Sequence, residues 1–264
     1  MTVKERAALC ADDVLDGHFT LVSLPGMIDA ISLEGARGWT SPNPHPVLSL
    51  MQWTTTNTDL AAAALDSALE RFREKGHGFD WMTGPKCAHL IPLLQGKGFI
   101  EPSLDVAAMV CAIPRDVEAP VPAGIRISRI DDPEDLRVAR VMARGFDVPA
   151  EVGIIFHHAY LTPSPVQTSE VFAAFADDDD DPVGVGYLSY MADERSVLLR
   201  VSSVLESHRG RGIYRALVTH RLAAAAAQGR TQMFVHAYSD GSRAALEDLG
   251  FERIGTLQLH RWRP

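Results

Sequence analysis

The spacing of apolar residues in the second half of the chain predicts alternating strands and helices. Residues 125–130 alternate apolar and polar side chains, which is the period of a half-buried strand. A helix is expected to begin near Pro133, capped by Asp131 or Asp132, with its apolar side chains turned inward. A second helix is expected over 150–160.

Two apolar runs further on, residues 170–176 and 183–191, flank five consecutive aspartates at 177–181. Apolar runs on either side of a short polar segment predict a β-hairpin. Adjacent carboxylates repel one another, so the loop is expected to be solvated. A metal site, or a docking patch for a basic partner, is the alternative for this loop.

Further apolar runs and one alanine-rich stretch predict the remaining elements of this half. In chain order they are a central strand at 196–204, a helix at 216–228 ended by Gly229, a strand at 232–238, a helix at 241–249, the pair Gly250-Phe251 and a last strand at 253–262.

The first half of the chain repeats this order. Its elements are a helix at 60–75 capped by Thr58 or Asp59 and ended by Gly76, a strand at 79–82, a helix at 87–95, the pair Gly98-Phe99 and a strand at 106–112. A repeated order of helix, strand, helix, Gly-Phe and strand predicts a tandem duplication. The proline-containing segment 113–124 is the expected linker, and the predicted domains are 1–118 and 119–264.

Composition and charge narrow the class of protein. The 264 residues are 46% hydrophobic, which supports a substantial core, and their net charge is −9. This charge argues against nucleic acid as a general partner and favours a cationic or amine-bearing substrate. No apolar run has the character of a signal peptide or a membrane span, so a cytoplasmic location without membrane contact is expected. Cys10, Cys87 and Cys111 show neither zinc-site spacing nor a disulfide framework, and no metal is expected.

The turn between the central strand and the alanine-rich helix has the composition of an anion site. The first turn of a helix leaves backbone N–H groups without partners and carries partial positive charge. Gly210 and Gly212 let a phosphate approach the backbone, and Arg209 and Arg211 add charge-assisted donors. No Lys-Ser or Lys-Thr follows the glycines, which argues against a nucleotide P-loop. Arg215 replaces the third glycine of the dinucleotide-binding fingerprint, which argues against that motif too.

Residues 209–214 (Arg-Gly-Arg-Gly-Ile-Tyr) resemble the pyrophosphate-binding motif of the GNAT superfamily of acyl-CoA-dependent N-acyltransferases. In that motif Gln or Arg is followed by two residues, Gly, one residue, and Gly or Ala, so Tyr214 departs from the pattern. Residues 232–262, with a helix that ends in Leu-Gly-Phe, are similar to the second half of the same superfamily. Two functional positions differ, since Ser239 stands where the family often has Asn and Leu246 where it often has a proton-donating Tyr.

The resemblance implies an α/β fold with a mixed sheet, in which two GNAT-like acyl-CoA N-acyltransferase folds follow in tandem. It also implies an acetyl-CoA site in the second half, with pantetheine along the central strand and pyrophosphate on the turn. The implied cofactor-binding residues are Ser202, Ser203, Val204, Arg209, Gly210, Arg211, Gly212, Ile213, Tyr214, Arg215 and Ser239. The first half has a Thr/Asn turn at 54–59 without glycine or arginine, so a degenerate half is expected there.

The sequence does not identify the residues that transfer protons in the reaction. The family often places a Glu base on the central strand, but residues 196–204 contain no carboxylate. Glu206, with His208 beside it in the turn, is therefore a candidate base, and Tyr238 is the candidate donor to the thiolate. Glu206 as a solvated turn residue, and Tyr238 as an aromatic that closes a strand, are the alternatives. His157-His158 lacks a third ligand at metal spacing.

These observations predict an acetyl-CoA-dependent N-acetyltransferase that acts on a primary amine, carried by a small molecule rather than by a histone-like protein. The residues that replace Asn and Tyr favour a rival, a non-catalytic acyl-CoA-binding or sensing protein. A structural pairing of two degenerate halves, without CoA binding, is a third alternative. The sequence leaves the oligomeric state open, with a homodimer among the alternatives.

Overall fold

The structure is a computed structural model that describes residues 11–18, 23–163, 167–177 and 179–264. The described chain forms two compact units. The C-terminal unit contains residues 109–236 and 240–253, and the N-terminal unit contains 11–108, 237–239 and 254–264. These bounds differ from the predicted domains 1–118 and 119–264, because the last strand of the chain pairs with a strand of the first half.

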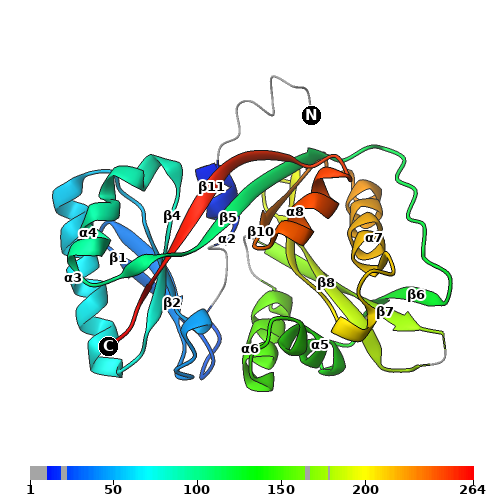
Figure 1. The fold of residues 1–264 in the computed structure, drawn as a ribbon, viewed down its shortest axis with the longest axis horizontal. Coiled ribbons are helices and arrows are strands. Elements are labelled where there is room, and N and C mark those ends of the chain that lie inside the picture. The colour runs from blue at the N-terminus through cyan, green and yellow to red at the C-terminus, as the bar shows by residue number, and fades with distance from the viewer. Residues whose placement is uncertain (1–10, 19–22, 164–166, 178) are drawn as a thin grey trace. The chain divides into compact units, whose positions relative to one another are not determined.

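The N-terminal unit contains a sheet with the strand order β1-β2-β3-β4-β11. The described elements of the first half are α2 (Ala11–His18), β1 (Asp29–Leu33), β2 (Ala36–Thr40), η1 (Pro46–Leu48), β3 (Leu50–Trp53), α3 (Thr58–Lys75), β4 (Phe79–Thr83), η2 (Pro85–Leu90), α4 (Ile91–Gly96) and β5 (Ile100–Ala112) (Figure 1). The strands β3 and β4 are parallel, and the neighbours β1/β2, β2/β3 and β4/β11 are antiparallel.

β11 (Glu252–Trp262) joins the first-half sheet through β4. Arg261 on β11 donates two hydrogen bonds to the Asp80 carboxylate, Nε to Oδ1 at 2.7 Å and NH2 to Oδ2 at 2.8 Å. Burial raises the pKa of Asp80, and the Arg261 bond opposes this rise. The pair fixes the register of the two strands, because a slip would leave a buried carboxylate without its cation.

The predicted helix at 60–75 is α3, which begins two residues earlier and ends at Gly76 with a φ of 66°. The expected caps, Thr58 and Asp59, are wrong: the side chain of Asn57 accepts from the N–H of Leu60. Small and apolar residues of α3 face the core, and they pack around aromatic side chains from the sheet. This core contains Ala61, Ala64, Leu65, Ala68, Leu69, Phe72, Phe79, Trp81, Leu90, Leu94, Phe99 and Trp262.

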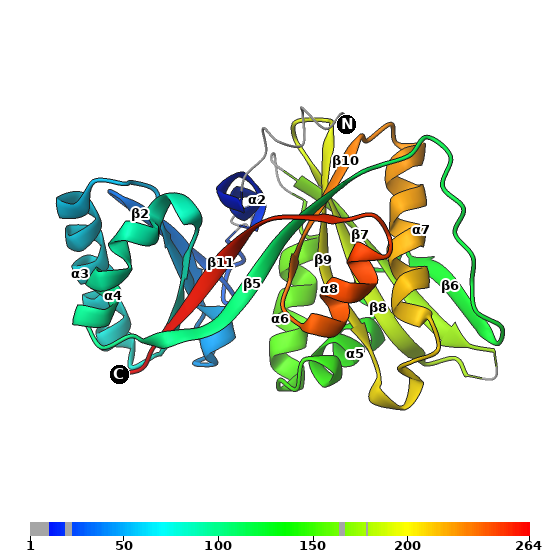
Figure 2. The same cartoon turned by 45° about the horizontal axis from the view of Figure 1, so that its top comes forward.

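The C-terminal unit contains the sheet order β10-β9-β8-β7-β6. Its elements are β6 (Ile125–Ile130), α5 (Arg137–Gly145), α6 (Ala150–Leu161), β7 (Gln167–Ala176), β8 (Pro182–Met191), β9 (Ser196–Val204), η3 (Glu206–His208), α7 (Ile213–Ala227), β10 (Gln232–Ala237) and α8 (Asp240–Glu247) (Figures 1 and 2). β9 and β10 are parallel, and the neighbours β6/β7, β7/β8 and β8/β9 are antiparallel.

Helices cover both faces of this sheet. Successive strand residues point to opposite faces, and on β8 the ring of Tyr187 contacts His157 of α6, whereas Gly186 lies against Arg221 of α7. α5 and α6 therefore cover one face, and α7 the other. The predicted start of the first helix was wrong, since Asp132 accepts from the N–H of Glu134 in a turn and α5 begins later.

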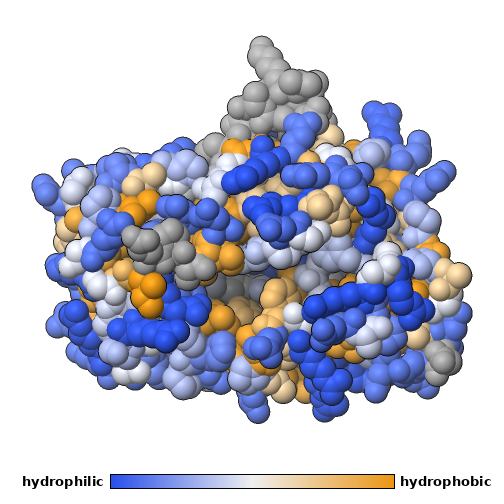
Figure 3. All heavy atoms as spheres, viewed as in Figure 1, coloured by the Kyte–Doolittle hydropathy of each residue, from blue (hydrophilic) through white to orange (hydrophobic). Residues whose placement is uncertain are grey.

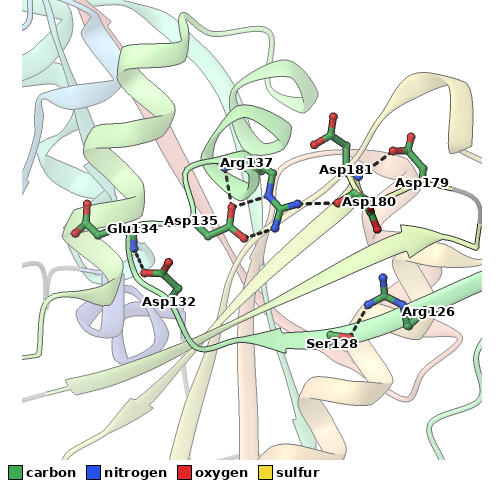
Figure 4. A network of polar contacts seen from close by, with 9 residues as sticks. All are labelled: Arg126, Ser128, Asp132, Glu134, Asp135, Arg137, Asp179, Asp180 and Asp181. Carbon is green, nitrogen blue, oxygen red and sulfur yellow. Dashed lines mark hydrogen bonds and ion pairs between the residues drawn. The ribbon is translucent and has the colours of Figure 1, made fainter.

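The acidic segment closes the predicted hairpin between β7 and β8 (Figure 4). Arg137 donates to both carboxylate oxygens of Asp135 and to the main-chain carbonyl of Asp180, at 2.8 to 2.9 Å. The N–H of Asp181 donates to Asp179 Oδ1 at 2.8 Å. The side chains of 179–181 are exposed, as expected for a solvated loop. Among the described residues no group of three His, Cys, Asp or Glu is placed to hold a metal ion.

Hydrophilic side chains predominate on the face drawn in Figure 3, and apolar ones are scattered among them. Within the described ranges, no helix combines the length and the apolar character needed to cross a membrane.

Candidate functional site

The site begins where two parallel strands separate. β10 pairs with β9 over only four residue pairs, which end at Val235 and Leu199. β9 continues to Val204 while its other edge stays paired with β8, where Gly184 is opposite Val204. The β9 edge from Arg200 to Val204 therefore has no β10 residue opposite it, and its backbone groups on that side can pair with an extended ligand.

A β-bulge bends β9 at the same place. Gly186 of β8 is opposite Ser202, but the next residue, Tyr187, is opposite Arg200. Val201 is therefore the additional residue on β9. A bulge increases the local twist of a strand and redirects the residues after it, and here it lies directly after Arg200, where β9 is no longer paired with β10.

The Gly-Arg turn follows and starts α7. Gly210 has a φ of 75° and Gly212 a φ of 77°, in the left-handed region that glycine occupies without strain. Within the described chain, the backbone N–H groups of residues 210–215 donate to no backbone carbonyl, and the first intrahelical bond runs from the N–H of Ala216 to Gly212. No acidic residue lies in the first turn of α7. The N–H groups and the helix dipole fit an anion with several oxygens, such as a pyrophosphate.

The arginines of the turn have different roles. Arg209 donates from Nε to the carbonyl of Val204 at 3.2 Å, which ties the turn to the end of β9. Arg215 forms an ion pair with Asp248 after α8 at 2.7 Å. Arg211 is exposed. Tyr214 is half-buried on the first turn of α7, and burial raises the pKa of its hydroxyl.

Two serines of β9 hold the strand from opposite faces. Ser203 donates from Oγ to the carbonyl of Val141 in α5 at 3.1 Å. A methyl group at Gly145 would lie 1.6 Å from this Oγ, so the end of α5 can approach β9 only as glycine. Ser202 accepts from NH2 of Arg221 at 2.7 Å. The strand is therefore fixed at both serines before it reaches the turn.

The predicted catalytic residues lie on exposed segments. Glu206 begins η3 and its side chain is exposed. Tyr238 follows β10 and is 36% exposed. Ala237, Tyr238 and Ser239 belong to the N-terminal unit, whereas the other predicted residues lie together in the C-terminal unit. Leu246 is fully buried and apolar, so it supplies no proton where the family often has Tyr.

His157 is a buried residue with both ring nitrogens bonded. A carbonyl can only accept, so Nε2–H donates to Pro133 O at 2.7 Å, and Nδ1 accepts from the Tyr187 hydroxyl at 2.8 Å. Burial lowers the pKa of His157, so the ring stays neutral. Neither this pair nor the cavity of about 390 Å³ lined by Thr83 and Gln258 in the N-terminal unit includes a predicted site residue.

Sequence analysis missed two residues that shape the site, Gly145 and Arg221. Neither belongs to a motif, and each acts through contacts with β9, from α5 and α7 respectively. One signal for Arg221 was available in the sequence. It occupies a position of α7 that faces the sheet, and arginine is rarely buried unless it has bonded partners.

Comparisons with known proteins agree with this geometry. The family described as Acetyltransferase (GNAT) family matches residues 148–251. No curated protein sequence matches the chain.

Several solved structures share the fold over nearly the whole chain. A GCN5-related N-acetyltransferase from Kribbella flavida has a TM-score of 0.69 at 16% identity and covers 100% of this chain and 96% of its own. A GCN5-related N-acetyltransferase from Sphaerobacter thermophilus has a TM-score of 0.67 at 15% identity. The match covers 99% of this chain and 90% of the Sphaerobacter chain. A tandem GNAT protein from the clavulanic acid biosynthesis pathway has a TM-score of 0.66 at 14% identity. The match covers 97% of this chain and 89% of the tandem protein.

At these identities the structural likeness establishes the fold, which is the mixed α/β fold of tandem GNAT proteins. The family match covers the central strand, the Gly-Arg turn and α7. Residues 148–251 therefore match the GNAT acetyltransferase family, and the chain as a whole shares the fold of tandem GNAT proteins.

Proposed function

We propose that this protein is an acetyltransferase that binds acetyl-CoA in its C-terminal unit and transfers the acetyl group to a primary amine of a small molecule. The observation that carries the proposal is the β9 edge at 200–204, which has no β10 residue opposite it and leads through η3 into a turn of N–H groups without backbone acceptors. An extended pantetheine arm and a pyrophosphate need this combination of strand edge and helix start.

Different residues of the chain are proposed to bind the two parts of acetyl-CoA. Backbone groups of Ser202, Ser203 and Val204 pair with the pantetheine arm. The N–H groups from Gly210 to Arg215 bind the pyrophosphate, and the side of Gly210 is open, with nothing within 4 Å of a methyl group placed there. Ile213 is buried under the turn and anchors it.

Acetyl-CoA supplies an activated acyl group with a thiolate leaving group. The chain must keep the amine neutral and provide a proton for the thiolate. We propose Tyr238 as the proton donor and Glu206 as the base, acting directly or through water. Ser239 is proposed to contact the cosubstrate beside Tyr238. The net charge of −9 favours the approach of a cationic amine.

The first experiment is calorimetric titration of the full chain with acetyl-CoA and with CoA, followed by an assay of thiol release with a panel of polyamines, amino sugars, amino acids and one basic peptide. We expect saturable binding at one site per chain and release that depends on a small amine. Absence of binding at millimolar acetyl-CoA would refute the proposed function. Binding without release on any amine would support the rival, a non-catalytic acyl-CoA sensor, which Leu246 favours.

Substitution Tyr238→Phe tests the proton donor. We expect kcat to fall about 100-fold, the usual contribution of a positioned acid, with acetyl-CoA affinity unchanged. Tyr190→Phe is the control, because it removes a hydroxyl that donates to Glu170 on β7. An unchanged kcat in Tyr238→Phe would remove this residue from the mechanism.

A further inference from the structure

Arg221 is a fully buried cation in the C-terminal unit. It lies on α7 with no exposed surface. Among the described residues no carboxylate forms an ion pair with it, and its bonded acceptors are three main-chain carbonyls and one hydroxyl. Burial lowers the pKa of Arg221 to about 10, so the guanidinium is still charged at neutral pH. Burial of a charge is costly, and a carboxylate partner would be the common compensation.

The acceptors of Arg221 lie on both sides of the β9 bulge. NH1 donates to the carbonyl of Tyr187 on β8 at 3.0 Å and to the carbonyl of Arg200 on β9 at 3.3 Å. NH2 donates to Ser202 Oγ at 2.7 Å. Arg200 is the residue before the additional residue Val201, and Ser202 is the residue after it. The guanidinium therefore joins the two strands and spans the bulge.

Two features keep the guanidinium in this position. Nε donates to the carbonyl of Leu217, one turn earlier on α7, at 2.9 Å. Gly186 on β8 provides the space, because a methyl group there would lie 2.5 Å from the central carbon of the guanidinium. The planar fork has little room to move, and its donors can reach carbonyls on two strands together.

We infer that Arg221 is a positioning residue that holds the β9 bulge and thereby sets where the edge at 202–204 is presented to the pantetheine arm and the thioester. The inference rests on the proposed function, since it gives this edge a ligand. Ser203 holds the same strand from the α5 face, so Arg221 completes a pair of restraints on opposite faces of β9.

Arg221→Lys tests the inference, because an ammonium retains the charge but lacks the planar fork that bonds both strands. We expect the Kd for acetyl-CoA, measured by calorimetry, to rise about tenfold, equivalent to about 1.4 kcal/mol. We also expect faster amide hydrogen exchange at residues 200–204 in the protein without ligand. Exchange in the N-terminal core around Phe72 serves as the internal reference.

Gly186→Ala tests the same contact without removing a functional group. The added methyl group must displace the guanidinium, so we expect the same rise in Kd and in exchange at 200–204. Gly184→Ala is the matched control on the same face of β8, because its methyl group would crowd Ile213 and Leu217 at 3.2 Å and the carbonyl of Ser203 at 3.3 Å instead of Arg221, and exchange is therefore compared before Ser203. The control is expected to lower the melting temperature without faster exchange at 200–202.

The outcomes separate this inference from the proposed function. If wild-type protein does not bind acetyl-CoA, the proposed function fails. If wild-type protein binds and both Arg221→Lys and Gly186→Ala keep its Kd and its exchange rates at 200–204, only the role of Arg221 is refuted. Should Arg221→Lys not fold, Gly186→Ala decides: wild-type values overturn the inference, and a rise in both quantities supports it.

Discussion

The starts of α3 and α7 occupy equivalent places in the two halves but present opposite surfaces to an anion. At α3 the Asn57 side chain accepts from the N–H of Leu60 at 2.9 Å, and Asp59 adds a negative charge in the first turn. At α7 the first residue outside the helix is Gly212, and the first turn has no acidic residue. A phosphate competes with an internal cap in the first case and meets none in the second.

The first half is also closed where its strands separate. β3 and β4 pair only at Leu50/Asp80 and Met51/Trp81. Trp53 is the last residue of β3, and its ring centroid lies 4.8 Å from that of Trp81. Its Nε1 donates to the carbonyl of Ala61 in α3. The two halves therefore differ both at the helix start, which is capped only in the first half, and beyond the last strand pair, where only the first half has a tryptophan bonded to the helix.

The largest effect on stability is expected when Trp53 of the first half is replaced. Trp53→Ala removes a 5% exposed indole and its bond to α3, so we expect a loss of about 3–5 kcal/mol in the free energy of unfolding. Denaturant unfolding followed by circular dichroism measures it. Phe146→Ala, at an aromatic residue that is 47% exposed, is the control and should change stability by less than about 0.5 kcal/mol. Equal effects of the two changes would contradict the view that Trp53 fills the first half.

Gly212→Glu should prevent an anion from binding at the start of α7 in the second half. A carboxylate at this position repels a pyrophosphate and adds strain at a φ of 77°, so we expect acetyl-CoA affinity to fall at least about 100-fold, or about 2.7 kcal/mol. Gly229→Glu is the matched control, because Gly229 has a φ of 71° at the other end of α7. Calorimetry on both variants separates charge at the site from backbone strain, and equal affinities in the two variants would remove the turn from the site.

Each structural unit contains a buried histidine that should make stability depend on pH. Burial lowers the pKa of His157 and of His260 below the unfolded value of 6.5. Their contribution is complete above pH 6.5 and is lost as the pH falls toward the folded pKa, by about 1.4 kcal/mol per pH unit for each histidine. Melting curves from pH 7.5 to 5 measure this loss.

The two histidines differ in their bonds. Neither ring nitrogen of His260 has a hydrogen-bond partner among the described residues, whereas both nitrogens of His157 are bonded. His260→Leu should therefore keep stability at pH 7.5 and flatten the pH dependence. His157→Leu should lower stability at both pH values, and a flat profile in the wild type would contradict the prediction.

The smallest effect concerns the cap of α3. Asn57→Ala should cost about 1 kcal/mol of stability, the usual value of an N-cap, and should leave acetyl-CoA affinity unchanged. A double change, Asn57→Gly with Asp59→Arg, should also create no second binding site, because Trp53 still bonds to α3 and contacts Trp81. Two sites per chain in a titration of this variant would show that the cap alone closes the first half.

Local signals in the sequence were sufficient for most of the fold. The period-2 alternation at 125–130 and the apolar run at 196–204 predicted β6 and β9 with their observed bounds. The glycine-containing turn was expected directly before the alanine-rich helix, and Gly210 and Gly212 lie directly before α7 in the left-handed region. These features depend on neighbours in the chain, so the sequence contains the information needed to predict them.

Long-range partners were not predictable in this way. The strands β1, β2 and β3 were not predicted before Thr54, and the pairing of β11 with β4 changes the bounds of both predicted domains. Arg221 could not be assigned to β9 because its acceptors are carbonyls on β8 and β9, and carbonyls are present at every residue. Such contacts are set by tertiary packing, which spacing along the chain does not reveal.

The pairing of β4 with β11 has a consequence for folding during synthesis. Asp80 and Arg261 are 181 residues apart, so at about 5–20 residues per second a ribosome needs roughly 10–40 s to supply the partner of Asp80. During that time β4 lacks one neighbour and a buried carboxylate lacks its cation. An open strand edge recruits other strands, so nascent chains of this protein should depend on chaperones until residues 254–264 emerge.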